Sequence, residues 1–267
     1  MKEQRGYIPF MEKHPHSKNV QGSYKKADLH LHTNRTDGTL TPQKVVDKAL
    51  AVGLDAIAIT DHNTIVSSEI AFDYVQQKGL QLEVVKGIEV SSRDGHVLAL
   101  GMSCDVERGR SLEDTIRDIH RQNGLVIIPH PDLKGASSVH LGLLHELLGS
   151  KDIDLYLDGI EVVNGSELMM RRFDKLGIIA RRDDSRIRQF LNLHEENPKM
   201  GSLVGNTDAH TKNVGFGISL YSSESVLSAL RNKATVPMQT TTTILEDLGQ
   251  SLRMAYSVIT SHLSGRI

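Results

Sequence analysis

The chain has 267 residues, a length that suits one large α/β barrel or two small domains. Apolar residues make up 39% of it, enough for a buried core, and the formal net charge of −2 excludes a strong overall attraction to nucleic acid or to an anionic membrane. The one cysteine, Cys104, excludes an intramolecular disulfide and fits a reducing compartment. Because no run of 18 apolar residues occurs and residues 1–24 lack the apolar segment of a signal peptide, we expect a cytoplasmic protein with no membrane partner.

The first expected strand, 26–33, carries polar side chains at every second position. Asp28, His30 and His32 alternate with leucines. Successive side chains of a strand point to opposite faces, so these three share one face. The two imidazoles lie about 7 Å apart at a rise of ~3.3 Å per residue, close enough to reach a common metal ion. The alternative is two unrelated histidines that hydrogen bonds satisfy, and the rest of the chain decides between the two interpretations.

The next part of the chain alternates between helical and strand patterns. A helix begins with Thr41 as N-cap and Pro42 at its first position, and it ends at Gly53. The expected elements that follow are strand 55–60, helix 67–78 and strand 82–90. This order favours parallel strands that are joined by crossover helices.

The connection to the next strand, 96–102, breaks this alternation. Only five residues, 91–95, precede it, which is too few for a parallel crossover. We therefore predict a hairpin whose corner is the Asp-Gly dipeptide in this connection. His96 opens its strand, and the hairpin brings it to the same end of the sheet as Glu89.

The remainder of the chain is expected to contain helix 111–123, strand 125–129, helix 141–148, strand 159–163, helix 167–180, strand 201–206 and helix 223–231. We interpret the run 171–188 as a charged helical surface rather than a nucleic-acid patch, because acidic residues lie among its basic ones. The expected domains are an N-terminal arm over 1–24, a barrel over 25–240 and, over 241–267, an amphipathic helix that packs on the barrel or on a partner.

Six of the seven predicted strands place His, Asp, Glu or Asn at or just after their C-terminal end. In barrels and open α/β sheets this end carries the active site, and unrelated core histidines would not all fall there. The nine candidate ligands are His30, His32, Asp37, His62, Glu89, His96, His130, Asp208 and His210.

The chemistry of these candidates points to more than one metal ion. Imidazoles and carboxylates are ligands of Zn²⁺, Mn²⁺ and Fe²⁺, and the absence of cysteine from the set argues against a closed structural zinc site. Nine ligands are enough for two or three ions with open positions. Clustered divalent ions suit the hydrolysis of phosphate esters, because they neutralise phosphate oxygens and lower the pKa of a bound water.

The candidate ligands lie in six short motifs, which are Asp28-Leu-His30-Leu-His32-Thr33, Thr60-Asp61-His62, Gly87-Ile-Glu89-Val90, Gly95-His96-Val-Leu98, Pro129-His130-Pro131 and Asp208-Ala-His210. These motifs, in this order, are similar to those of the PHP (polymerase and histidinol phosphatase) family, and the resemblance covers residues 26–219.

The resemblance implies an α/β fold, a distorted (β/α)7 TIM-like barrel, with a trinuclear metal centre. On the matching positions, the first metal would be held by His30, His32, Glu89 and Asp208, the second by Asp37, His62 and His210, and the third by Glu89, His96 and His130. Position 37 is Asp where other members of the family have His, which leaves the metal preference of the second site open.

The function implied is metal-dependent hydrolysis of a phosphate ester. We hypothesise that a metal-bridging hydroxide attacks phosphorus in line and that a metal-bound water or a nearby histidine protonates the leaving oxygen. No catalytic residue distinct from the metal ligands is then needed. Candidate substrate contacts are Arg35 and Lys134, which follow the first and fifth strands, and Asn164.

The expected partner is a phosphorylated small molecule or a nucleotide, and nucleic acid is compatible with the sequence without being indicated by it. Two other functions stay open, a non-catalytic metal-binding PHP domain and an amidohydrolase-like metal hydrolase. The choice between a monoester and a diester, the metal and the oligomeric state are not determined by these motifs.

Overall fold

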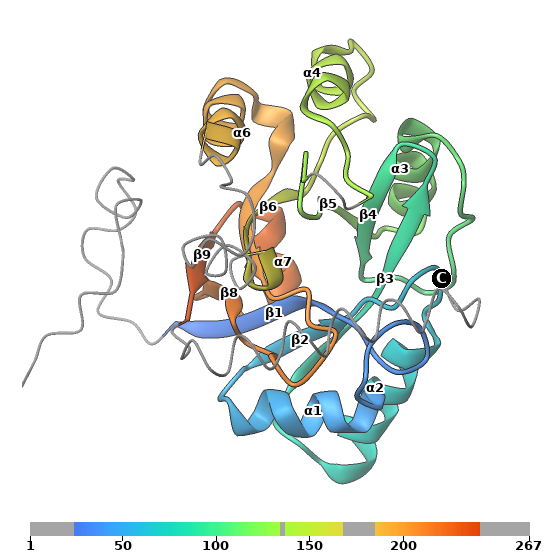
Figure 1. Ribbon diagram of the computed structural model, residues 1–267, viewed down its shortest axis with the longest axis vertical. Helices are drawn as coiled ribbons and strands as arrows, with labels where there is room; N and C mark the ends of the chain where they lie inside the picture. Colours follow the sequence, from blue (N-terminus) through green and yellow to red (C-terminus); the bar gives the residue numbers. More distant parts are fainter. Residues whose placement is uncertain (1–23, 134–136, 168–184, 241–267) are drawn as a thin grey trace, which may run out of the picture.

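The computed structural model describes residues 24–133, 137–167 and 185–240. Nine strands in these residues form one sheet in the order β7-β6-β5-β4-β3-β2-β1-β8-β9 (Figure 1). The strands are β1 (Lys25–Leu31), β2 (Ala56–Ile59), β3 (Glu83–Ser92), β4 (Gly95–Leu100), β5 (Leu125–Ile128), β6 (Gly159–Asn164), β7 (Ser202–Asn206), β8 (Gly217–Tyr221) and β9 (Thr235–Gln239). The helices are α1 (Pro42–Ala51), α2 (Val66–Lys78), α3 (Leu112–Arg121), α4 (Leu141–Gly149), α6 (Ser185–Glu196) and α7 (Val226–Arg231), with a 3-10 turn, η2, at Pro198–Met200.

Strand β4 runs against its two neighbours. Strands β1, β2 and β3 pair in parallel, as do β5, β6 and β7, whereas β4 is antiparallel to both β3 and β5. The pairing of Ser92 with Gly95 confirms the predicted hairpin. The start of β4 therefore lies beside the C-terminal ends of its neighbours, and His96 faces the same region as Glu89.

Contacts between β7 and the last two strands bring the sheet round into a nearly closed barrel. Strand β8 pairs with β1, and its Ser219 hydroxyl both donates to the carbonyl of Gly205 and accepts from its amide, each at 3.0 Å. A Cβ on Gly205 would lie 2.5 Å from the carbonyl oxygen of Ile218, so this approach requires glycine. The predicted distorted (β/α)7 barrel is confirmed, and β8 and β9 are additions that the sequence pattern did not predict.

Helices begin and end where capping residues predict them. The Thr41 hydroxyl accepts a hydrogen bond from the amide of Lys44 at the start of α1, and the Ser111 hydroxyl does the same for Asp114 at the start of α3. Gly79, with a φ of 61°, ends α2. In Figure 1, α1 and α2 lie together on the outer side of β1 and β2, and α3 lies beside β4.

Some predicted elements differ or lie outside the described residues. The helix expected over 223–231 is shorter, because Ser225 caps α7. Helix α6 was not expected as a separate element. The N-terminal arm up to residue 23, most of the helix expected over 167–180, and the C-terminal helix over 241–267 lie outside the described residues. Among the residues that are described, no helix is long and apolar enough to cross a membrane.

Asp28 joins β1 to the chain around β7 and β8. Its fully buried carboxylate accepts hydrogen bonds from the amides of Thr207 and Gly215, each at 2.9 Å. Burial raises the pKa of Asp28 from 3.8 to about 6, although these hydrogen bonds act in the opposite direction. Asp28 is therefore a structural residue of the barrel, two positions before the first histidine of the HxH motif.

This raised pKa predicts that the protein loses stability relative to an Asp28→Asn variant as pH rises. Between the two pKa values the folded state binds more protons than the unfolded state, so deprotonation favours unfolding. From about pH 4 to about pH 7 the free energy of unfolding of the wild type, relative to that of the variant, should fall by about 2 kcal/mol. Urea denaturation across this range measures the difference, and a difference that does not change with pH would contradict the assignment.

Candidate metal centre

The structure brings all nine candidate ligands together at one end of the barrel. His30 lies on β1, and His32 and Asp37 follow it. Glu89 lies on β3 and His96 on β4. The others follow strand ends: His62 after β2, His130 after β5, and Asp208 and His210 after β7. Each of the nine belongs to at least one group of three or four side chains whose ligand atoms lie within 4.8 Å of one another.

The carboxylate of Glu89 lies at the middle of the cluster and is 1% exposed. Imidazole nitrogens surround its two oxygens at 2.9–3.4 Å, and they belong to His30, His32, His62, His96 and His130. Strand β3 places this side chain, and four different segments of the chain supply the histidines. Glu89 can therefore be shared between neighbouring metal ions.

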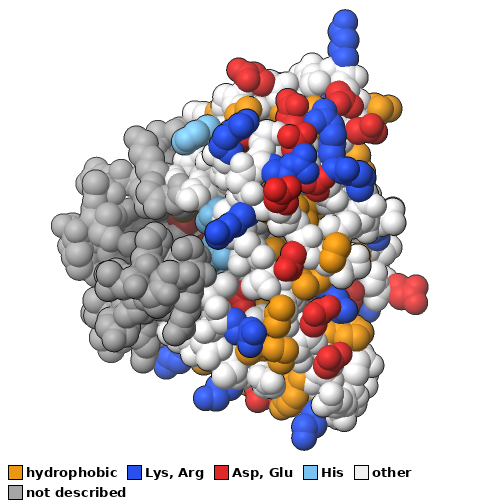
Figure 2. Space-filling view, turned by 90° about the vertical axis from the view of Figure 1, so that its right-hand side faces the viewer, with side chains coloured by type: hydrophobic (Ala, Val, Ile, Leu, Met, Phe, Trp, Pro, Cys, Tyr) orange, Lys and Arg blue, Asp and Glu red, His pale blue; other side chains and the backbone are white. Residues whose placement is uncertain are grey.

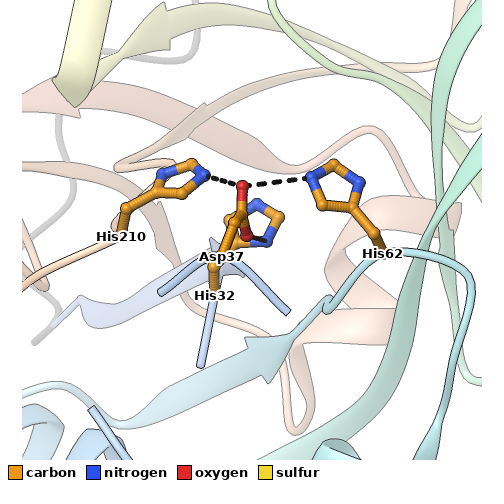
Figure 3. Close-up of side chains that lie close together, drawn as sticks. All are labelled: His32, Asp37, His62 and His210. Carbon is orange, nitrogen blue, oxygen red and sulfur yellow. Dashed lines mark hydrogen bonds and ion pairs between the residues drawn. The ribbon is translucent and has the colours of Figure 1, made fainter. Parts of the chain in front are cut away.

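A second group forms around Asp37 in the loop after β1. Its carboxylate lies 2.8 Å from His210 Nε2, 3.3 Å from His32 Nδ1 and 3.4 Å from His62 Nε2, and Figure 3 shows the three rings arranged around it. These four side chains form one of the groups that could hold an ion. The group contains the three residues of the implied second site and adds His32.

Asp208 faces the other side of the cluster. One carboxylate oxygen lies 3.4 Å from the Nε2 atoms of both His30 and His32 and 3.5 Å from His210 Nδ1. The remaining groups are His30, His130 and Asp208, then His30, His32 and Glu89, and finally His62, Glu89 and His96. His130 thus groups with His30 and Asp208 rather than with His96, and His62 takes its place beside His96.

The cluster is held in a strained backbone. Two of the six non-glycine residues with positive φ in the described chain follow the C-termini of helices, where such a residue is ordinary. The other four are two candidate ligands, His130 (30°) and Asp208 (57°), and two residues that closely follow candidate ligands in the chain, Asn63 (58°) and Asp132 (52°). Strain of this kind persists where the surrounding structure enforces it, and it is concentrated at functional sites.

The buried carboxylates and imidazoles of the cluster stabilise one another's charged forms. Burial lowers the pKa of His30, but the carboxylates of Asp208 and Glu89 outweigh it and hold this pKa well above its usual value. The pKa of His32 is raised in the same way, with Asp37 as the main cause that opposes burial. Burial raises the pKa of each of these carboxyl groups, but the facing imidazoles outweigh it and hold them well below the usual range.

Buried ring nitrogens without a hydrogen bond support the fit of the cluster to metal ions. His30 Nε2, both ring nitrogens of His32 and His62 Nδ1 are buried and make no hydrogen bond within the described residues. Buried polar atoms are normally hydrogen-bonded, so such a concentration needs an explanation. Imidazole and carboxylate donors that converge without cysteine suit Zn²⁺, Mn²⁺ or Fe²⁺.

Two supporting carboxylates were not predicted. Asp61, fully buried, accepts hydrogen bonds from the amide (2.6 Å) and hydroxyl (2.5 Å) of Thr33 and from the hydroxyl of Thr36 (2.9 Å), and so orders the loop that carries Asp37. Glu161, also buried, lies behind His30. The available signal for Asp61 was its position directly after an apolar strand, within the motif that contains His62. Glu161 lies inside an apolar strand, where a search for ligands at strand ends does not find it.

The predicted substrate contacts are placed differently from one another. The side chain of Asn164 is buried, and its amide group donates to Glu161 at 2.8 Å and to Asp208 at 3.4 Å. Arg35 is exposed in the loop after β1. Lys134 lies outside the described residues. A contact of any of them with substrate stays a prediction.

Sequence comparisons identify the family. The profile of the PHP domain matches residues 28–126. An uncharacterized protein of Methanocaldococcus jannaschii is 34% identical over 154 residues, which cover 52% of this chain and 81% of that protein. The chain belongs to the PHP family.

Shorter matches are to enzymes with named activities. A 5'-3' exoribonuclease of Escherichia coli is 31% identical over 98 residues, which cover 36% of this chain and 33% of the enzyme. A 3',5'-nucleoside bisphosphate phosphatase of Chromobacterium violaceum is 34% identical over 79 residues, which cover 28% of this chain and 27% of the enzyme. These matches span a third or less of the length of each enzyme.

Solved structures share the fold. A two-domain protein from Bacteroides vulgatus, described as containing a PHP-like metal-dependent phosphoesterase, has a TM-score of 0.58 and 19% identity over 86% of this chain and 70% of that chain. An amidohydrolase from Chromobacterium violaceum has a TM-score of 0.52 and 18% identity over 80% of this chain and 97% of that chain. At these identities the likeness concerns the barrel alone.

We predict that divalent ions bind this cluster with release of protons. Because the raised pKa values keep His30 and His32 protonated without an ion, binding must displace protons, and affinity for Zn²⁺ or Mn²⁺ should rise roughly tenfold per pH unit for each proton displaced. Isothermal titration calorimetry from about pH 6 to about pH 8, in buffers of different ionisation enthalpy, measures both quantities.

Two variants locate this binding. His32→Ala removes a member of two of the groups and should lower both the number of bound ions and the affinity. His145→Ala removes an exposed histidine of α4 and should bind as the wild type does. Equal binding by the wild type and His32→Ala would place the ions elsewhere.

Proposed function

We propose that this protein is a hydrolase that cleaves phosphate esters with divalent metal ions at the barrel end. The observation that carries the proposal is the overlap of the ligand groups: Glu89, His30, His32 and His62 each belong to more than one. Ions held by overlapping groups would be neighbours, the arrangement suited to a phosphate that needs both its entering and leaving oxygens supported. Family membership and the named activities of relatives support the same chemistry.

Up to three ions would be held by the four ligand groups. One ion would be held by His32, Asp37, His62 and His210. The other ions would be held by the three remaining groups, each of which contains Glu89 or Asp208. When bound, such ions supply Lewis acidity, which neutralises phosphate oxygens and acidifies a water for attack at phosphorus.

The chain's own residues define the side from which substrate enters. The side chains of His30 and His32 are 0% exposed, whereas those of His96 and Asp208 are 17% exposed and that of His210 is 11% exposed. The substrate phosphate therefore approaches past the less buried group. An imidazole at this edge that an ion does not engage as a ligand would be placed to pass a proton to the leaving oxygen.

We propose a phosphorylated small molecule or a nucleotide as substrate. The activities of the relatives, named for RNA and for a nucleoside bisphosphate, support a nucleotide. Figure 2 shows basic and acidic side chains interspersed on the face that it presents, so a single-sign surface for long nucleic acid does not occur among the described residues there.

Hydrolysis of a phosphoester panel tests the proposal. Protein reconstituted with Mn²⁺, Zn²⁺ or Fe²⁺ is given p-nitrophenyl phosphate, its bis-ester, histidinol phosphate, AMP, 3′,5′-bisphosphates and short oligonucleotides. We expect turnover that is lost on chelation and restored by metal. His30→Ala and Asp208→Ala should each lower kcat/KM by at least about 100-fold, because each removes a side chain that would hold an ion, and such an ion would stabilise the transition state by several kcal/mol.

The control for these variants is His145→Ala, which changes a histidine on the exposed side of α4 and should keep full activity. Full activity of His30→Ala would contradict the site assignment. Bound ions without turnover on any substrate would instead favour a non-catalytic metal-binding role.

A further inference from the structure

A buried glutamate that is not among the nine candidate ligands accepts four hydrogen bonds behind the centre. Glu161 lies in the middle of β6 and is 2% exposed. Oε1 accepts from His30 Nδ1 at 3.3 Å and from the side-chain amide of Asn206 at 3.0 Å. Oε2 accepts from the backbone amide of His130 and from the side-chain amide of Asn164, each at 2.8 Å. Each carboxylate oxygen thus receives two donors.

The His30 ring lies between Glu161 and the metal centre. Its Nδ1 atom faces Glu161, and its Nε2 atom faces Glu89 and Asp208, each at 3.4 Å. Nε2 makes no hydrogen bond within the described residues. An imidazole can offer a lone pair to a metal at one nitrogen only while the other nitrogen carries the proton.

We infer that Glu161 is a positioning residue, which fixes the His30 ring so that Nδ1 carries a proton and Nε2 is offered to metal, and which holds the backbone at His130. This inference rests on the proposed metal centre. A carboxylate behind a metal-binding histidine orients the ring and strengthens it as a ligand. Here one carboxylate acts on two candidate ligands from different strands.

The position of Glu161 is itself enforced by its neighbours. The Asn206 side-chain oxygen accepts from the amide of Leu29 at 3.0 Å, which links β7 to β1 directly beside His30. The Asn164 side-chain oxygen accepts from the amide of Glu167 at 2.8 Å. With both asparagine oxygens used as acceptors, their amide groups must donate, and Glu161 has to accept all four bonds.

Glutamine cannot replace Glu161 in this arrangement. A glutamine side chain has one accepting oxygen and an amide group that only donates. In Glu161→Gln, one pair of donors would face another donor, whichever way the side chain is turned. Either His30 Nδ1 or the amide of His130 would lose its acceptor, while the shape of the side chain would hardly change.

A matched control exists at the opposite end of the same strand. Asp158, just before β6, also accepts from a histidine ring nitrogen, His120 Nε2 at 3.0 Å, and from a backbone amide, Val126 at 2.8 Å. Among the described residues, the side-chain hydrogen bonds and ion pair of Asp158 involve only His120 and Val126, and none of the nine candidate ligands. Asp158→Asn therefore reproduces the loss of a carboxylate that joins a ring and an amide, away from the centre.

The test is the affinity for Zn²⁺, measured by competition with a chelator in the full chain. Glu161→Gln should weaken binding by about 10–100-fold, and Asp158→Asn should leave it unchanged, with circular dichroism confirming that both variants are folded. Wild-type affinity in a folded Glu161→Gln would overturn the inference and leave the metal centre intact. A wild type that binds no divalent ion would overturn the proposed function and this inference together.

A measurement on the wild type decides the matter even if Glu161→Gln does not fold. In the diamagnetic Zn²⁺ form with ¹⁵N-labelled histidine, long-range ¹H–¹⁵N correlation distinguishes the ring nitrogen that bears the proton. We expect His30 to carry it on Nδ1, with slow solvent exchange. A proton on Nε2, with Nδ1 bound to the ion, would overturn the inference.

Discussion

This end of the barrel depends on the electrostatic attraction between buried carboxylates and imidazoles around Glu89. Burying a lone carboxylate is costly, and burying several within one site is more so. Here the oxygens of Glu89 are met by imidazoles from β1, β2, β4 and β5. The carboxylates and imidazoles that make the centre suitable for metal ions therefore also hold these strands together at this end of the barrel.

This constraint explains the reversed strand. Parallel strands alone would bring to the cluster only the residues at their C-terminal ends. The hairpin between β3 and β4 turns the chain back at once, so a residue at the start of β4, His96, reaches Glu89 at 2.9 Å. The strained backbone at His130 and Asp208 aims two further side chains inward.

Much of the fold and the candidate site could be predicted from the sequence, because period-two strands and capping residues are local signals. The short connection before His96 even predicted which end of the barrel it reaches. Strand β8 was missed because its partner β1 is distant in the sequence. Strand β9 was missed because its partner is β8, which has no clear strand pattern of its own. The partition of ligands into groups was not predictable from spacing. It depends on how all the side chains of a group converge: His130 lies 3.2 Å from Glu89, closer than His62 at 3.4 Å, yet it groups with His30 and Asp208.

The supporting roles of Glu161 and Asp61 also could not be predicted from the sequence. Neither is exposed, and both bind backbone and side-chain donors that only the tertiary structure brings near. Position within the strand hid Glu161, because the sequence argument looked for ligands at strand ends. The substrate remains a separate question, because metal ligands recognise the phosphate and not the group attached to it.

Anomalous X-ray diffraction from crystals grown with Mn²⁺ tests the central claim most directly. The account predicts two or three anomalous peaks within the nine-residue cluster, with Glu89 in contact with more than one of them. An absence of peaks at the cluster, or one ion bound elsewhere while the cluster is empty, would contradict it.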